Sequence, residues 1–440
     1  MVSRMQGERA FAVMVSGVHG MDHLLKRLFP PLVPLWGLLY GFPLWQMGLV
    51  LGSLSFGGAI GQAPMGVLSD RYDRRYILPV GIGLSGLAVL GFSLTPGASA
   101  TQVTVFGTRL SGTVLAMTVA TFAIGIGSST VHPTGYPLIT ANVDERRKGR
   151  VLGSWGAAAK FGDGLAPAFV GALTLFLAWT NVVALFGAIG LVYAVFLYVS
   201  LGSFETRPGR THGDDDSTPD SAATTNGGAT PRRAYVVPLV VVFCYFVVHL
   251  MAAEGVSVFM PEFIASVYGY SGTVFGIELT PESTASFYYA ALLLTAGAAQ
   301  LGSGRLVDRH DPRLILLAFM GVSAVMLALV SLTLLPPITL LVALLVAGVG
   351  LWGVNPARDA IISDISPPEY EGRAFGYLWT GALLAMSVAP PIIGYVGDQF
   401  GLQRAFIVLA GAIVLATIPL LVLPYLRAEE TANSSQSTAQ

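Results

Sequence analysis

The sequence predicts an all-α integral membrane protein whose twelve transmembrane helices form two pseudo-symmetric six-helix bundles. Its composition is the first reason: hydrophobic residues make up 53% of the chain and charged residues 11%, and the mean hydropathy is +0.67. Soluble domains carry about a quarter charged residues. Apolar runs of roughly 20 residues, enough to cross ~30 Å of hydrocarbon as a helix, recur along the chain. A repeated polar motif predicts the pseudo-symmetry.

The repeat joins the two halves of the sequence. Gly66-x3-Asp70-Arg71-x-Asp73-x-Arg75 reappears 238 residues later as Gly304-x3-Asp308-Arg309-x-Asp311-x-Arg313. Gly125-x-Gly127-x4-His132-Pro133 reappears 223 residues later as Gly348-x-Gly350-x4-Asn355-Pro356, which also predicts matched kinks at the two prolines. The smaller second offset predicts a longer connection in the first half, around residues 96–112.

Twelve apolar spans divide the chain into domains. We expect them near residues 10–36, 44–68, 76–95, 113–140, 151–175, 179–202, 235–260, 285–307, 314–334, 338–364, 374–397 and 404–426. They define bundles at 1–202 and 235–440, a disordered linker at 203–234 and a disordered tail from about 428. The linker is too polar to bury a core, and it is either a solvated spacer or a regulatory segment.

Positive charge is concentrated in alternate connections. Arginine and lysine follow the second, fourth and eighth spans and flank the linker, at Arg71, Arg74, Arg75, Arg146, Arg147, Lys148, Arg150, Arg207, Arg210, Arg232, Arg233, Arg309 and Arg313. The connections at 37–44, 176–179, 262–284 and 335–338 contain neither residue. The positive-inside rule therefore predicts a multi-pass protein of the cell (plasma) membrane with both termini cytoplasmic. No cleavable export signal is expected, because charged residues interrupt the first apolar stretch.

Several classes of protein are disfavoured by what the sequence contains. The single cysteine, Cys244, leaves no internal disulfide and no cysteine metal cluster. A net charge of −1 argues against a nucleic acid partner. We expect no cofactor and no metal, and the chain has no glycine-rich phosphate loop, so any energy input must come from a gradient.

The duplicated loop motif, the twelve spans and the central linker resemble the major facilitator superfamily over roughly residues 10–426. Gly-Ile-Gly-Ser-Ser-Thr-Val-His132-Pro133 is similar to its fosmidomycin-resistance-like branch. Proton antiporters carry an arginine where this chain has Thr121, and their Gly-x3-Gly-Pro pattern reads Gly162-x3-Ala166-Pro167 here. The resemblance implies a secondary transporter that works by alternating access, and not an enzyme.

The repeated motif also has a mechanical interpretation. Glycine lets neighbouring helices approach, a carboxylate can lie at the positive end of a facing helix, and arginines can pair across the seam between the bundles. The resemblance implies a conformational latch made of Gly66, Asp70, Arg71, Arg75, Gly304, Asp308, Arg309 and Arg313. The alternative is plain positive-inside charge with a helix cap.

Ionisable residues inside the spans are costly in hydrocarbon, so we expect them to face a shared aqueous cavity. Four side chains share one face of the predicted first helix because their spacing is helical: His19, Asp22, His23 and Lys26. Arg27 is the next residue along that helix and lies beside this face. Asp22 with Lys26, and Lys160 with Asp163, could simply neutralise each other. Arg358 and Asp359 point about 100° apart, which makes a mutual ion pair less natural.

The charges in the spans suggest an anionic substrate. We expect substrate binding by His19, His23, Lys26, His132, Lys160, Arg358 and Trp352, and proton coupling through Asp22, Asp163, Glu254 and Asp359. The expected partners are a small organic anion or anionic drug, protons and the lipid bilayer, and the protein is expected to be a monomer. A multidrug/proton efflux antiporter, a membrane sensor and a metalloenzyme built on His19-x3-His23 remain alternatives. Trp36 and Trp45, at span ends, are expected to be interfacial anchors.

Overall fold

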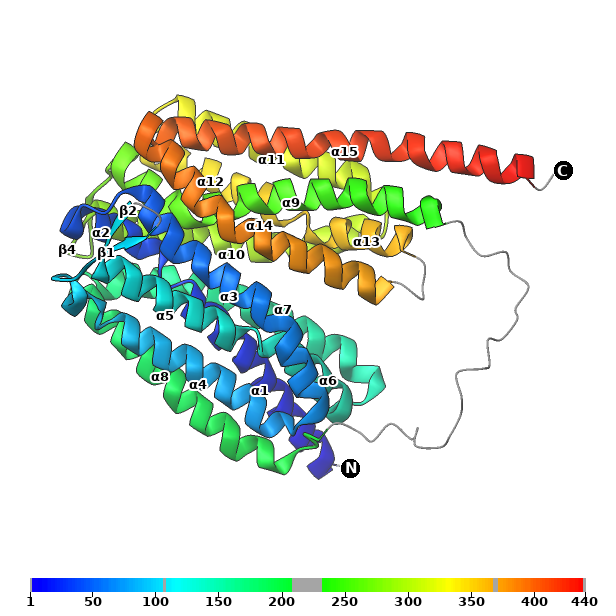
Figure 1. The fold of residues 1–440 in the computed structure, drawn as a ribbon, viewed down its shortest axis with the longest axis horizontal. Coiled ribbons are helices and arrows are strands. Elements are labelled where there is room, and N and C mark those ends of the chain that lie inside the picture. The colour runs from blue at the N-terminus through cyan, green and yellow to red at the C-terminus, as the bar shows by residue number, and fades with distance from the viewer. Residues whose placement is uncertain (1, 106–107, 208–231, 367–370, 438–440) are drawn as a thin grey trace.

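The computed structural model describes residues 2–105, 108–207, 232–366 and 371–437. Helices α1 to α8 form the N half and helices α9 to α15 form the C half, and the two halves lie side by side (Figure 1). Both termini lie at the same end of the molecule (Figure 1). Most of the linker, residues 208–231 with Arg210, lies outside the described residues, as do the side chains of Arg232 and Arg233.

Two of the predicted spans in the N half are interrupted. Its helices are α1 (Val2–Lys26), α2 (Val33–Tyr40), α3 (Leu44–Arg71), α4 (Arg74–Phe92), α5 (Gly112–Ser128), α6 (Val131–Asn142), α7 (Glu145–Leu173) and α8 (Trp179–Ser200). A 3-10 turn at Pro30–Leu32 separates α1 from α2, because Pro30 and Pro31 have no N–H to continue an α-helix. The fourth span is broken between α5 and α6, just before Pro133.

The C half repeats this arrangement. Its helices are α9 (Arg232–Phe263), α10 (Pro281–Val307), α11 (Pro312–Leu332), α12 (Pro337–Trp352), α13 (Asn355–Ile365), α14 (Glu371–Phe400) and α15 (Leu402–Ser437). The break between α12 and α13 precedes Pro356 as the break between α5 and α6 precedes Pro133, so the matched interruption is confirmed. Helix α15 continues to Ser437, past the end of the last predicted span, through the helix-favouring Ala428, Glu429 and Glu430, and the expected disorder of the tail stays a prediction.

The longer connection in the first half is confirmed. Residues 93–111 join α4 to α5, whereas residues 333–336 join α11 to α12. The extra residues contain an antiparallel hairpin of β1 (Gln102–Val105) and β2 (Thr108–Ser111). A second hairpin, of β3 (Gly272–Val274) and β4 (Ile277–Leu279), lies between α9 and α10. Neither hairpin was expected from the hydropathy pattern.

The helices account for twelve membrane spans. Within the described residues, nine are long and apolar enough to cross a membrane, counting α5 with α6 and α12 with α13 as single spans. Helices α1, α7 and α10 complete the twelve and are more polar. The all-helical membrane fold is therefore confirmed.

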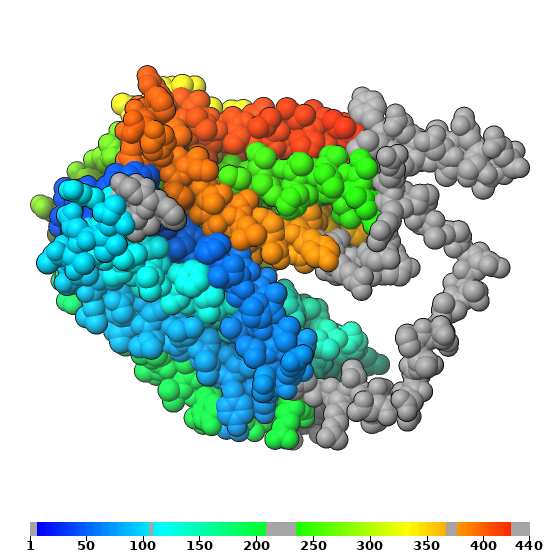
Figure 2. Space-filling view, in the orientation of Figure 1, coloured from blue at the N-terminus to red at the C-terminus, as the bar shows by residue number. Residues whose placement is uncertain are grey.

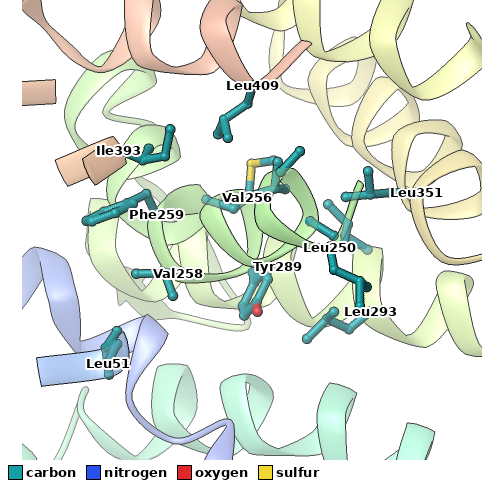
Figure 3. Close-up of a cluster of buried hydrophobic side chains, with 14 of the residues drawn as sticks. Leu51, Leu250, Val256, Val258, Phe259, Tyr289, Leu293, Leu351, Ile393 and Leu409 are labelled. Atoms are coloured by element: carbon teal, nitrogen blue, oxygen red, sulfur yellow. The ribbon is translucent and has the colours of Figure 1, made fainter. Parts of the chain in front are cut away.

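Buried apolar side chains pack the helices together. Around α9, residues such as Val256, Phe259 and Leu409 form one part of this core (Figure 3). Figure 3 also shows the hydroxyl end of Tyr289 turned from α10 toward the N half. Trp36, expected to be an interfacial anchor, is instead fully buried, because it packs in an aromatic group with Phe92 and Trp179.

The halves touch at the end opposite the termini. Along α3 and α14, Gly48, Gly52 and Gly394 lie so close to the backbone of the other half that a Cβ would collide with it. At the end that carries the termini, Figure 2 shows a recess between the halves. The molecule is therefore closed at one end and recessed at the other, and the charged helices α1, α7 and α10 lie between these ends.

Candidate substrate-binding site

Asp163 is the centre of the charged cluster. Its Oδ1 lies 2.9 Å from His23 Nδ1 and accepts a hydrogen bond from Arg27 Nε at 3.2 Å. Its Oδ2 accepts from Lys160 Nζ at 3.0 Å. Because His23 lies in α1, Arg27 directly follows α1 and Lys160 lies in α7, the carboxylate joins the two helices. The helical spacing predicted the α1 face correctly, and Arg27 belongs to the same cluster.

A second ion pair extends the cluster along α1. Lys26 Nζ lies 2.6 Å from Asp22 Oδ2, one helical turn away. Both pairs that the sequence left open as mutually neutralising, Asp22 with Lys26 and Lys160 with Asp163, are therefore formed, although Asp163 also contacts His23 and Arg27.

The cationic and anionic members of the cluster differ in exposure. The side chains of His23, Lys26, Arg27 and Lys160 are between 20% and 28% exposed. Those of Asp22 and Asp163 are 1% and 4% exposed. The carboxylates therefore lie behind the cations, and the accessible face of the cluster is positively charged.

An aromatic group borders the charged cluster. The His19 ring stacks on Trp155 at 4.4 Å between centroids, and His19 Nδ1 lies 3.0 Å from the Trp155 carbonyl oxygen. His23 and His132 each meet His19 edge-on, at 4.7 and 5.0 Å. His132 in turn stacks on the exposed Tyr136 of α6. The structure thus brings all three predicted histidines together around Trp155.

The C half contributes to the same region. Lys160 packs against Gly297 of α10, where an added Cβ would lie 2.8 Å from the lysine Cβ. Glu254 of α9 accepts a hydrogen bond from Ser55 of α3 at 3.4 Å, and its charge interacts with that of Arg27. Glu254 has no salt bridge to a residue that the structure describes, whereas Asp22, Asp163 and Asp359 each have one.

Arg358 occupies a separate place in the C half. Its guanidinium bonds to Asp359 at 2.8 Å and Asn355 at 2.9 Å, and it lies over the rings of Phe246 and Trp379. The expectation that Arg358 and Asp359 would not pair is wrong, because the long arginine side chain bends back along α13. With its side chain 3% exposed, Arg358 is not brought together with the N-half cluster.

The predicted latch residues do not join the halves in this conformation. Asp70, Arg71, Asp308 and Arg309 are exposed at the end that carries the termini. Arg75 donates to the Tyr198 carbonyl within the N half, and Arg313 pairs with Asp311 within the C half. The prediction that helices pack closely at Gly66 and Gly304 is wrong for this conformation, because a Cβ at either position would have no heavy atom within 4 Å. The recess separates the surfaces that the latch would join.

Sequence reasoning missed several neighbours of the site. Trp155, Tyr136 and Ser55 border the cluster, and Tyr289 interacts electrostatically with Arg27. The glycine at position 135 is an indirect sign of the position of Trp155, since a Cβ there would collide with the Trp155 ring. Trp352, predicted to bind substrate, packs half-buried against the apolar core, and no described contact joins it to the cluster.

Comparison with known proteins identifies the family. The family model described as Major Facilitator Superfamily matches residues 15–281 and 243–440. This chain belongs to the major facilitator superfamily. It is therefore a membrane transporter by family and not an enzyme. The closer resemblance to the fosmidomycin-resistance-like branch stays a prediction.

Similar superfamily proteins cover most of the chain. An uncharacterized MFS-type transporter of Methanocaldococcus jannaschii is 20% identical over 377 residues, covering 86% of this chain and 88% of the relative. The glycerol-3-phosphate transporter of Bacillus subtilis is 24% identical and covers 90% and 87%. A bacterial homolog of the human lysosomal transporter Spinster, solved in an inward-facing conformation, has a TM-score of 0.73 at 14% identity, covering 96% and 98%. At 14% identity, the similarity to this solved structure shows a shared fold alone.

Proposed function

We propose that this superfamily member is a proton-coupled transporter of a small organic anion. The observation that carries the proposal is the orientation of the charged cluster between α1 and α7. Its cations are accessible and its carboxylates are buried behind them. An incoming anion therefore meets Lys26, Arg27 and Lys160 before it meets Asp22 or Asp163.

The chemistry of the cations favours carboxylate or phosphate groups. An arginine fork can bind such groups through two parallel hydrogen bonds, and lysine adds a compact charge. A bound anion would compete with Asp163 for Arg27 and Lys160, so that release of the substrate restores the internal ion pairs. Two relatives support this substrate class by name, the glycerol-3-phosphate transporter and a probable galactarate/D-glucarate transporter of Bacillus subtilis.

Counterflow in proteoliposomes tests the substrate class. Vesicles loaded with an unlabelled organic phosphate or dicarboxylate should accumulate the labelled compound, and a neutral analogue of similar size should not exchange. Lys160→Gln should reduce the exchange roughly tenfold, the effect of losing about 1.4 kcal/mol of binding, whereas Lys160→Arg should keep most of it. Lys148→Gln is the matched control, because this lysine of α7 pairs with the exposed Glu145. Equal exchange by Lys160→Gln and wild type would overturn the anion proposal.

Glu254 is our candidate proton carrier. Of the four carboxylates considered, it is the one without a salt bridge to a described residue. A buried carboxylate that is not held in a salt bridge is expected to take up a proton more readily than one that is. Because Glu254 belongs to the C half and bonds to Ser55 of the N half, its environment would change as the halves move apart.

The coupling can be separated from binding. Glu254→Gln should keep counterflow but lose accumulation driven by a pH gradient. Glu262→Gln is the control, because this second carboxylate of α9 lies one residue from the end of the helix. Full gradient-driven accumulation by Glu254→Gln would assign the coupling to another group, and loss of accumulation in both variants would contradict a specific role for Glu254.

We also propose that the recessed end is cytoplasmic in the plasma membrane, following the distribution of lysine and arginine. The latch of Asp70, Arg71, Arg75, Asp308, Arg309 and Arg313 would then form when the halves close at that end. This closure would bring the surfaces of the two motifs together and would explain why no contact joins them in the recessed state.

A broad-specificity efflux antiporter is the second candidate. A multidrug resistance protein of Serratia proteamaculans is 32% identical over 163 residues, which cover 37% of this chain. The accessible cations disfavour lipophilic cations as substrates. Expression of the protein in a drug-sensitive host distinguishes the candidates, because resistance to cationic drugs together with absent anion counterflow would favour the second.

A further inference from the structure

The end opposite the termini contains a hydrogen-bonded contact between the halves that the proposed function does not use. Oδ1 of Asp398, near the end of α14, accepts from the Leu44 N–H at 2.8 Å. Oδ2 of the same carboxylate accepts from the Trp45 N–H at 2.9 Å. These are the first two N–H groups of α3, so a side chain of the C half caps a helix of the N half.

Helix α3 has no side-chain cap of its own. The first N–H groups of a helix have no partner within it and are usually satisfied by a Ser, Thr, Asp or Asn side chain just before it. Here that position is Pro43, which makes no capping hydrogen bond. Asp398 takes over this role from the other half, and its negative charge also suits the positive end of the helix.

The helix that corresponds to α3 in the other half of the repeat, α10, is capped in a different way. With the repeat offset of 223, Asp398 corresponds to Leu175, which has no carboxylate. Helix α10, the counterpart of α3, is capped by its own Thr280, whose hydroxyl accepts from the Ser283 N–H. The cap between halves is thus confined to the contact of α3 with α14, where Gly394 lets Leu44 approach α14 closely.

We propose that Asp398 is a removable cap that holds the molecule closed at the end opposite the termini. When the halves separate there, the Leu44 and Trp45 N–H groups and the carboxylate exchange their mutual bonds for water. Because Asp398 is exposed, this exchange costs little, as a gate that must reopen in every transport cycle requires. The proposal depends on alternating access and not on the charge of the substrate.

The distance between the halves at this end can be measured without substrate. Spin labels on Ser99→Cys and Gln403→Cys, both in exposed positions, would report it in full-length Cys244→Ser protein in nanodiscs. Asp398→Ala should raise the population with the long distance roughly fivefold, in line with the usual effect of losing a helix cap. Thr280→Ala is the matched control, because it removes a cap within one half and should leave the distance distribution unchanged.

A second variant keeps the proposal falsifiable if Asp398→Ala does not fold. Pro43→Ser gives α3 a cap of its own at a position whose backbone is already extended (φ −65°, ψ 151°). It should release Asp398 and raise the long-distance population without lowering thermal stability. A wild-type distance distribution in Pro43→Ser, or in folded Asp398→Ala, would overturn the proposal.

Discussion

Lys160 and Asp163 form an ion pair of 3.0 Å within one turn of α7, but only the lysine side chain keeps substantial contact with solvent. Asp163 also holds His23 of α1 and Arg27, which directly follows α1. This carboxylate therefore fixes the basic side chains in place while it stays buried itself, so the accessible face of the cluster is left to them.

Asp163→Asn should destabilise the protein. Removing one partner of a buried ion pair leaves uncompensated charge and costs about 3–5 kcal/mol, and the partial exposure of Arg27 and Lys160 favours the lower part of that range. Thermal unfolding in detergent measures the effect. Glu145→Gln, which breaks a solvent-exposed pair worth about 0–1 kcal/mol, is the control. An Asp163→Asn protein that unfolds at the wild-type temperature would contradict the central position of this carboxylate.

Gly297→Ala should disturb the site from the C half. The added methyl would lie 2.8 Å from the Lys160 Cβ, and such overpacking typically costs about 1–3 kcal/mol. We expect weaker counterflow and lower stability. Gly302→Ala, on the same helix with nothing within 4 Å, should instead be neutral or gain up to about 1 kcal/mol from helix propensity. Equal behaviour of the two variants would mean that packing at Gly297 does not position Lys160.

Asp70→Asn should reduce transport while leaving membrane insertion and stability intact. Asp70 is exposed in the recessed conformation, so the variant loses only contacts that form when that end closes. Asp73→Ala should behave differently, because Asp73 caps α4 through the Arg75 N–H at 2.9 Å and its loss should cost about 1 kcal/mol. Initial uptake rates and unfolding temperatures separate the two effects, and full uptake by Asp70→Asn would remove the latch.

Acid should loosen the segment that leads into the linker. Partial burial acts to raise the pKa of Asp73, but hydrogen bonds from the Thr206 hydroxyl and the Arg75 N–H, with the Arg207 charge, hold that pKa below its usual range. A carboxyl whose pKa is lowered on folding stabilises the folded state above its unfolded pKa, and this stabilisation is lost as the pH falls through the folded pKa. The protection of the Arg74 amide, whose N–H donates to the Thr206 carbonyl, should therefore fall below about pH 4, when its exchange rate is compared with the intrinsic rate at each pH. Asp73→Asn should show a lowered protection that depends little on pH, and a wild-type pH profile of protection in this variant would contradict the assignment.

Local and repeated patterns made much of the fold and part of the site predictable. Hydropathy indicated the spans, and the offset between the repeats indicated the longer connection before α5. Helical spacing grouped His19, His23 and Lys26 on one face, because that grouping depends only on the geometry of a single helix.

Contacts between distant segments were not predictable in this way. Trp155 meets His19 only after α1 packs on α7, and Trp36 is buried because α2 folds back beside Phe92. The capping of Leu44 by Asp398 depends on how two halves dock, and periodicity carries no information about that. The place of Arg358 apart from the cluster was not predictable either, because an intramembrane arginine can be satisfied by its own neighbours, here Asn355 and Asp359, as well as by a substrate.

A structure of the protein with a transported substrate bound tests the account most directly. We predict that the anionic group of the substrate lies within ion-pair distance, about 4 Å, of Lys160 Nζ or of the Arg27 guanidinium. A substrate bound elsewhere, with Lys26, Arg27 and Lys160 still paired to Asp22 and Asp163, would contradict the account.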